Sequence, residues 1–217
     1  MKLYLFGGAG GEAAAELKLI SDTIQSLHPK QVLWIPFARI QPGSEPDWQG
    51  NWPHRFMDWT GIEFLDASSE EDMARVVNPL IFISGGSKGN NLMDELNRRP
   101  ELVEIIKNTE IVIGESKGSM ALGKCFRARS SDTADSAMIE GLNIVQDTII
   151  EAHYTQFGLQ EILKEEVKNL NLSYGIGIDT VTGIAFETSE FPTKWEKIGE
   201  GNVEVIRNTV IPAKAGI

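Results

Sequence analysis

A serine stands between two glycines in the run Gly114-Glu115-Ser116-Lys117-Gly118, directly after the apolar residues 111–113. A buried strand, a Gly-x-Ser-x-Gly turn and then a helix are typical of a turn that exposes a nucleophilic serine. The N–H of Lys117 and the positive end of the following helix could stabilise an oxyanion there. The pattern therefore favours a nucleophile at Ser116 over a purely structural turn.

A second glycine turn, Ser84-Gly85-Gly86-Ser87, also follows an apolar run and precedes a predicted helix. Both turns should open at the same carboxyl edge of a parallel sheet, so the N–H of Gly86 is a candidate second oxyanion donor. A phosphate site at the helix start is the competing interpretation. However, the spacing does not match a P-loop, and the glycine run 7–11 lacks the acidic residue that dinucleotide-binding folds carry after the next strand.

A serine nucleophile needs a base within hydrogen-bond reach, and the sequence contains three histidines. His28 stands next to Pro29 at a predicted helix end, which favours a solvated cap. His54 lies in a long loop. His153 follows the predicted strand Thr148–Glu151, where it can be held rigidly, so it is the best candidate base by location. By position alone, a structural role for His153 is equally open.

The loop that holds His54 extends from Arg39 to Asp58. Loops of this length in compact domains are usually functional or disordered. The loop contains two tryptophans and three prolines, namely Trp48, Trp52, Pro42, Pro46 and Pro53. The tryptophans could form a lid or a substrate wall, and a surface loop packed by its own aromatic side chains is an equal alternative.

Composition narrows the possible partners. The chain has 217 residues, of which 41% are hydrophobic and 24% charged, as in an ordinary globular domain. The net charge of −11 argues against nucleic acid or an anionic membrane as the main partner. The single cysteine, Cys125, excludes an intramolecular disulfide and a cysteine-based zinc site, and a buried hydrophobic role is favoured over a catalytic thiol. We expect no cofactor and no metal.

The N-terminal residues 1–6 are as apolar as a short signal peptide, but they lack a small-residue cleavage site and continue directly into glycines. We therefore expect them to form the first buried strand. Since no apolar run approaches the roughly 20 residues that span a bilayer, we expect a cytoplasmic protein.

Strands and helices alternate along the first half of the chain. Apolar strands are predicted at 3–6, 32–35, 62–65, 80–84 and 110–113, and helices at about 17–27, 90–98 and 101–108, with a short helix ending at Leu122. The strands lack polar alternation, which predicts a three-layer α/β sandwich with a mostly parallel central sheet. The second half predicts strands at 148–151, 175–178, 183–186 and 203–206 and a helix at 155–168. We expect one domain over residues 1–207, and the composition of 208–217 favours a disordered tail.

Five segments together resemble the serine peptidase family of dipeptidase E (aspartyl dipeptidase) and cyanophycinase. In order, these segments are Val32–Arg39, Phe82–Leu92, Gly114–Gly118, Glu151–Tyr154 and Gly175–Asp179. The resemblance covers most of the chain. It implies a fold similar to class I glutamine amidotransferases, which is flavodoxin-like or Rossmann-like, with serine in place of the amidotransferase cysteine.

The resemblance also implies roles for particular residues. Ser116 would be the nucleophile, His153 the base, and the N–H groups of Gly86 and Lys117 the oxyanion donors. Asp132 lies near the position where the dipeptidase branch carries an aspartate, so it ranks first as the acid that orients His153. Asp179 ranks second, because the cyanophycinase branch has a glutamate after Gly-Ile-Asp, where this chain has Thr180.

Two positions depart from the family pattern. Lys117 stands where relatives carry alanine, and it could lower the pKa of Ser116, bind a substrate carboxylate or block the pocket. The segment 155–160 has no arginine, although the dipeptidase uses an arginine there to select aspartate. Lys88, Asn90 and Lys117 are therefore the candidate substrate-binding residues.

Taken together, the sequence predicts a serine peptidase that hydrolyses small peptides, as a dipeptidase or exopeptidase, through an acyl-enzyme. The alternative is a catalytically inactive binding or regulatory protein with the same fold. A glutaminase is disfavoured because Cys125 lies well past the nucleophile turn. An α/β-hydrolase esterase is disfavoured because His153 follows Ser116 too closely and no His-Gly oxyanion loop is present.

Overall fold

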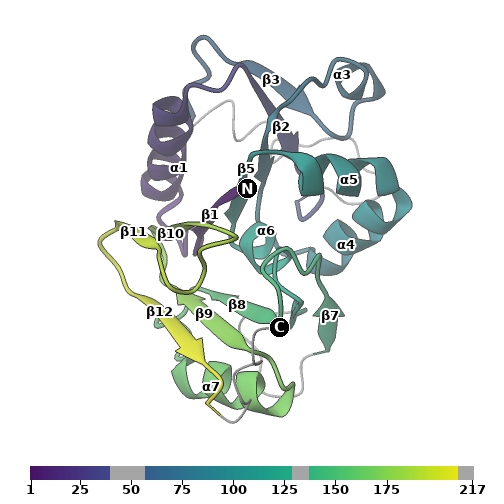
Figure 1. Ribbon diagram of the computed structural model, residues 1–217. Helices are drawn as coiled ribbons and strands as arrows, with labels where there is room; N and C mark the ends of the chain where they lie inside the picture. Colours follow the sequence, from purple (N-terminus) through teal and green to yellow (C-terminus); the bar gives the residue numbers. More distant parts are fainter. Residues whose placement is uncertain (40–56, 129–136, 210–217) are drawn as a thin grey trace.

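The computed structural model describes residues 1–39, 57–128 and 137–209, and its larger β-sheet contains seven strands (Figure 1). They are β1 (Lys2–Phe6), β2 (Gln31–Ile35), β3 (Glu63–Asp66), β4 (Leu80–Ile83), β5 (Ile111–Glu115), β10 (Thr182–Glu187) and β11 (Glu196–Gly199). Their order across the sheet is β11-β10-β1-β5-β4-β2-β3. The first five strands along the chain are mutually parallel, and β10 and β11 add antiparallel neighbours at one side. The prediction of a mixed α/β fold with mostly parallel strands is confirmed.

Helices cover both faces of this sheet. They are α1 (Ala13–Leu27), α4 (Gly89–Arg98), α5 (Pro100–Asn108) and the single-turn α6 (Lys117–Met120). Figure 1 shows α1 on one side of the sheet and α4 and α5 on the other. Leu17, Ile20 and Ile24 of α1 are buried against aromatic side chains such as Phe6 and Trp34, because they recur on one face of the helix.

The strands of the second half form a separate sheet of five strands. They are β6 (Cys125–Arg127), β7 (Met138–Glu140), β8 (Thr148–Ala152), β9 (Tyr174–Ile178) and β12 (Val203–Arg207), in the order β12-β9-β8-β6-β7. This sheet shares a core with the first, since Ile150 and Ile176 pack in the same cluster as Leu3 and Val112. Helix α7 (Gln160–Asn169) packs on the sheet through Leu163 and other apolar residues. The short strands β6, β7 and β11 were not predicted.

Helix α7 begins five residues later than predicted. Residues 154–158 form turns, and Gly158 has a positive φ of 64° that a helix does not allow. The apolar spacing therefore correctly predicted a helix at α7, but the predicted helix began too early in the sequence. At the other end of the chain, Asn208 is buried and donates to the carbonyl groups of Val167 and Leu172.

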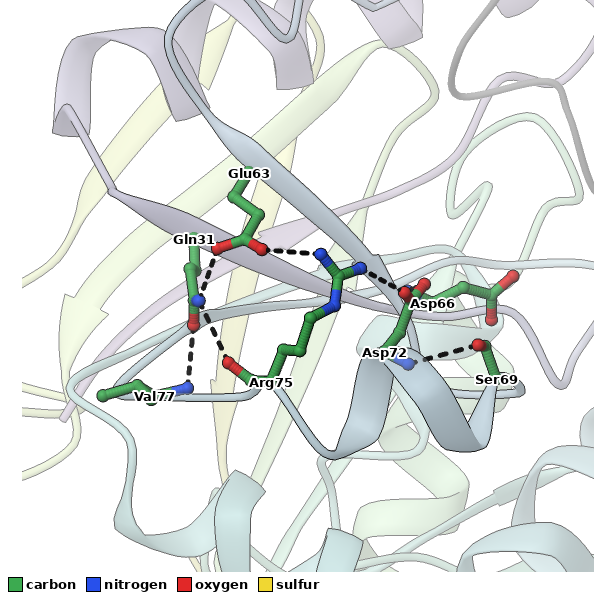
Figure 2. Close-up of polar contacts among 7 residues, drawn as sticks. All are labelled: Gln31, Glu63, Asp66, Ser69, Asp72, Arg75 and Val77. Carbon is green, nitrogen blue, oxygen red and sulfur yellow. Dashed lines mark hydrogen bonds and ion pairs between the residues drawn. The ribbon is translucent and has the colours of Figure 1, made fainter.

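The edge strand β3 is tied to the short helix α3 (Glu70–Met73) by a polar network, which Figure 2 shows. Arg75 donates to Glu63 at 3.0 Å and to Asp72, while the N–H of Asp66 donates to Asp72 at 2.9 Å. Ser69 caps α3 by accepting from the N–H of Asp72. This network lies at the side of the sheet opposite to β10 and β11. Within the described residues, no helix is long and apolar enough to cross a bilayer.

Candidate active site

Ser116 lies at the sharp turn between β5 and α6. Its backbone angles, φ 52° and ψ −114°, are unusual for a residue with a side chain, and its N–H donates to the carbonyl of Phe6 in β1 at 2.9 Å. Strained backbone of this kind persists when surrounding structure holds it, and it is typical of a nucleophile turn. The turn places Ser116 at the carboxyl edge of the central strands.

The two glycines around Ser116 are required by close packing. A Cβ on Gly114 would lie 2.7 Å from the backbone of Ser119, and a Cβ on Gly118 would lie 2.0 Å from the carbonyl oxygen of Ile83. Both positions bring a helix against a strand with no room for a side chain. The hydroxyl of Ser119 also joins α6 to β1, because it accepts from the N–H of Phe6 and donates to the carbonyl of Phe6.

His153 comes to the same edge from the end of β8. Its Nε2 lies 3.3 Å from Ser116 Oγ, which is a hydrogen-bond separation. The backbone N–H of His153 donates to the carbonyl of Gly7 at 3.1 Å. Burial lowers the pKa of His153, the carboxylate of Glu115 acts in the opposite direction, and Lys117 lowers it further. The imidazole is therefore neutral at neutral pH, and its Nε2 can accept a proton from Ser116.

The other ring nitrogen of His153, Nδ1, is buried and has no hydrogen-bond partner within the described residues. Asp179 makes no hydrogen bond to it. Instead, Asp179 accepts from the N–H of Thr155 and from the backbone and side chain of Asn202, which fixes a loop beside the site. Asp132, the first-ranked acid, lies outside the described residues, as do Trp48, Trp52 and His54 of the predicted loop.

Ser116 and His153 face a cleft of about 420 Å³. Its lining also includes Ala9, Gly10, Arg39, Gly86, Ser87, Glu115, Lys117 and Ala128. Within the part of the chain that the structure describes, the N–H groups of Gly86 and Lys117 have no acceptor. Two unused backbone donors beside a serine hydroxyl are the arrangement that an oxyanion requires.

The side chain of Lys117 is buried and turns toward the second sheet. Its Nζ donates to the carbonyl oxygen of Arg127 at 2.9 Å, and the guanidinium of Arg127 pairs with the buried carboxylate of Glu151. Burial lowers the pKa of Lys117 to about 8, although Glu151 acts in the opposite direction. The ammonium group of Lys117 thus has a protein partner.

Lys88 and Asn90 lie in a neighbouring cleft of about 360 Å³, which shares Ser87 and Ala128 with the first. Both residues are exposed, and they flank the first residue of α4. The predicted substrate-binding residues therefore line two adjacent clefts, Lys117 the first and Lys88 and Asn90 the second. Among the described residues, no group of three or more His, Cys, Asp or Glu side chains is arranged to hold a metal ion.

Three charged residues that sequence reasoning missed are buried or half-buried at this edge: Glu115, Arg39 and Glu16. Glu115 Oε2 accepts from Arg39 Nη2 at 3.2 Å. Glu16 is wholly buried in α1 and accepts from the N–H of Gly8 at 3.0 Å. Only Glu16 had a signal in the sequence, because its spacing from Ile20 and Ile24 (i, i+4, i+8) puts it on the apolar face of the helix.

Glu16 should make the stability of the fold depend on pH. Burial, with a smaller contribution from Glu115, raises the pKa of Glu16 from 4.5 to about 8. The stability that this gives is fully present below pH 4.5 and is lost as the pH rises through 8. We expect the free energy of unfolding of Glu16→Gln, relative to that of wild type, to increase by on the order of a few kcal/mol as the pH rises from 5 to 9. Urea denaturation at several pH values measures this difference.

Glu12→Gln is a matched control for that experiment. Glu12 precedes α1 and its side chain is exposed, so the substitution removes the same charge without changing a buried group. If Glu16→Gln and Glu12→Gln show the same pH dependence, buried Glu16 is not the source of the effect.

Comparisons with known proteins identify the family and the fold. A sequence model of peptidase family S51 matches residues 3–193. The fold is similar to the crystal structure of a "Putative Peptidase E Protein from Listeria monocytogenes EGD-e", with 18% sequence identity and a TM-score of 0.54. The match covers 96% of this chain and 98% of that one. No curated protein sequence matches significantly.

Proposed function

The chain belongs to peptidase family S51 and is a serine peptidase, and from this premise we propose that it hydrolyses small peptides, as a dipeptidase or exopeptidase, through an acyl-enzyme on Ser116. The observation that carries the proposal is the 3.3 Å separation between Ser116 Oγ and His153 Nε2 at a strained strand-to-helix turn. A nucleophile and a base in this relation are the minimum that acyl transfer requires.

In the proposed mechanism, His153 accepts the proton of Ser116 as Oγ attacks the scissile carbonyl. The N–H groups of Gly86 and Lys117 then donate to the oxyanion of the tetrahedral intermediate. His153 gives the proton to the leaving amine. Water then attacks the acyl-enzyme, and His153 accepts a proton from this water and returns it to Ser116 Oγ as the acyl group leaves. We propose Asp132 as the acid that orients His153, following the family resemblance.

The cleft supports a small substrate. A volume of about 420 Å³ accommodates a few residues of a peptide, and its lining combines Arg39 and Lys117 with the carboxylate of Glu115. Because Nζ of Lys117 already donates to Arg127 and Arg39 already pairs with Glu115, we propose that Lys88 is the cation that meets a substrate carboxylate. We propose a cytoplasmic location, because a chain with a single cysteine cannot form the intramolecular disulfides that are common in oxidising compartments.

An inactive binding protein is the second candidate, and one observation favours it. His153 Nδ1 is buried without a partner among the described residues, whereas a triad histidine normally donates from this atom to a carboxylate. The two candidates differ in whether Ser116 reacts.

A fluorophosphonate probe tests the proposal directly, because it phosphonylates only an activated serine. We expect stoichiometric labelling of the wild-type protein at Ser116, located by peptide mass spectrometry, together with hydrolysis of members of a dipeptide panel. Ser26→Ala removes an exposed serine of α1 and should label normally. A folded wild-type protein that neither labels nor hydrolyses any peptide would establish the inactive candidate.

A further inference from the structure

The carboxylate next to the nucleophile, Glu115, joins three segments of the catalytic edge. Its Oε2 accepts from the N–H of Gly85, in the turn after β4, at 2.5 Å. The same oxygen accepts from Arg39 Nη2, after β2, at 3.2 Å. Glu115 itself ends β5 and is only 3% exposed. Charge-assisted hydrogen bonds in such a buried place are stronger than neutral ones, so this side chain restrains all three segments.

The glycine turn that Glu115 holds is packed against the nucleophile. A Cβ on Gly85 would lie 2.6 Å from the Cβ of Ser116, and a Cβ on Gly86 would lie 2.3 Å from the carbonyl oxygen of Ala38. The hydrogen bond to Gly85 fixes the peptide unit that directly precedes the one carrying the N–H of Gly86. Loss of this bond would leave the direction of that second N–H less defined.

Glu115 also carries a charge that acts on His153. Three titratable groups on different elements interact with it: Arg39 after β2, Glu16 in α1 and His153 after β8. Lys117, two residues further along the chain, instead directs its side chain to the carbonyl of Arg127. Glu115 and His153 line the same cleft as Ser116, and the carboxylate raises the pKa of His153 against the larger effect of burial and the effect of Lys117. Within the described residues, no carboxylate hydrogen-bonds to the ring of His153, and Glu115 is the one whose charge acts on it.

We propose that Glu115 is a positioning residue with two roles: its Oε2 aims the N–H of Gly86 at the oxyanion, and its negative charge stabilises the protonated His153 that forms when Ser116 gives up its proton. The inference rests on the proposed function of the same site. It assigns to Glu115 no contact with the substrate.

Two substitutions separate the two roles. In Glu115→Gln, the amide oxygen still accepts from Gly85 but the charge is lost. We expect kcat to fall about 10-fold with KM nearly unchanged, and the acid limb of the pH profile of kcat/KM to move to lower pH. In Glu115→Ala, the acceptor is lost as well, and we expect kcat to fall by about 10²-fold to 10³-fold, as after removal of an oxyanion donor.

A second measurement does not depend on any substrate. The imidazole resonances of His153, assigned with a His153→Gln variant, give its pKa by NMR titration in wild type and in Glu115→Gln. We expect a lower pKa in Glu115→Gln and no change in Glu12→Gln, the exposed control. Thermal melting shows whether each variant is folded, and the isosteric Glu115→Gln tests the charge even if Glu115→Ala does not fold.

The outcomes distinguish this inference from the proposed function. If wild type hydrolyses no peptide, the proposed function fails, while the NMR titration still decides the role of the charge. If wild type is active and Glu115→Gln has the wild-type pH profile and the wild-type His153 pKa, the charge role is overturned. If folded Glu115→Ala is as active as Glu115→Gln, the role in aiming Gly86 is overturned.

Discussion

Replacing Ser116 by alanine is expected to lower kcat for peptide hydrolysis by about 10⁴-fold or more, because no acyl-enzyme can form without the hydroxyl. Ser116 Oγ is placed 3.3 Å from His153 Nε2, and the cleft offers no second serine at a strained turn within the described residues. The fold should be retained, since the two bonds that the backbone of Ser116 makes, to Phe6 and Met120, do not involve the side chain.

Steady-state kinetics on the best dipeptide of the panel measure this loss. His153→Ala should cost a similar factor, and the double variant should lose little more, because a nucleophile and its base act as one unit. Additive losses would mean that the two residues work independently, which the proposed mechanism does not allow. Wild-type turnover by folded Ser116→Ala would exclude Ser116 as the nucleophile.

Replacing Gly8 by alanine is expected to lower kcat/KM by about 10²-fold, the cost of moving reacting groups by about 1 Å. A Cβ at this position would lie 2.7 Å from the Cβ of Ser116 and 2.8 Å from Cε1 of His153, so the pair must separate. Gly8 cannot easily move away. Its N–H donates to Glu16 and its carbonyl accepts from Val181, which fixes the loop on both sides.

Gly11→Ala is the matched control, because it separates collision from backbone strain. Gly11 also has a positive φ, 107° against 90° for Gly8, but a Cβ there meets no atom within 4 Å. We expect Gly11→Ala to lose stability by about 1–2 kcal/mol while keeping kcat/KM within a few-fold of wild type. Equal losses of activity in the two variants would show that strain, and not collision with the Ser116–His153 pair, is responsible.

The sequence predicted the parts of this site that depend on local order. Gly114-Glu115-Ser116-Lys117-Gly118 follows an apolar run, and a tight strand-to-helix turn needs glycines where strand and helix meet. His153 was proposed as the base because it stands just after a predicted strand. The apolar runs likewise gave the parallel strands β1, β2, β4 and β5, since strands buried on both faces have few polar residues.

The two glycine turns also suggested the oxyanion donors. The N–H groups of Gly86 and Lys117 have no acceptor in the part of the chain that the structure describes, and the same roles were implied by the family resemblance. It did not predict where the side chain of Lys117 goes. That depended on the carbonyl of Arg127, in a strand too short to predict.

Tertiary structure decided the rest, because the partners of a buried charge come from distant parts of the chain. Arg39 and Glu115 are 76 residues apart, and nothing in the sequence around either residue indicates that they form an ion pair. The separation of the strands into two sheets and the later start of α7 have the same origin. Local patterns in the sequence indicate which residues are buried, but only the tertiary structure determines which buried groups are in contact. For Ser116, the sequence determined the nucleophile turn, and only the folded chain brought Gly8 and His153 to it.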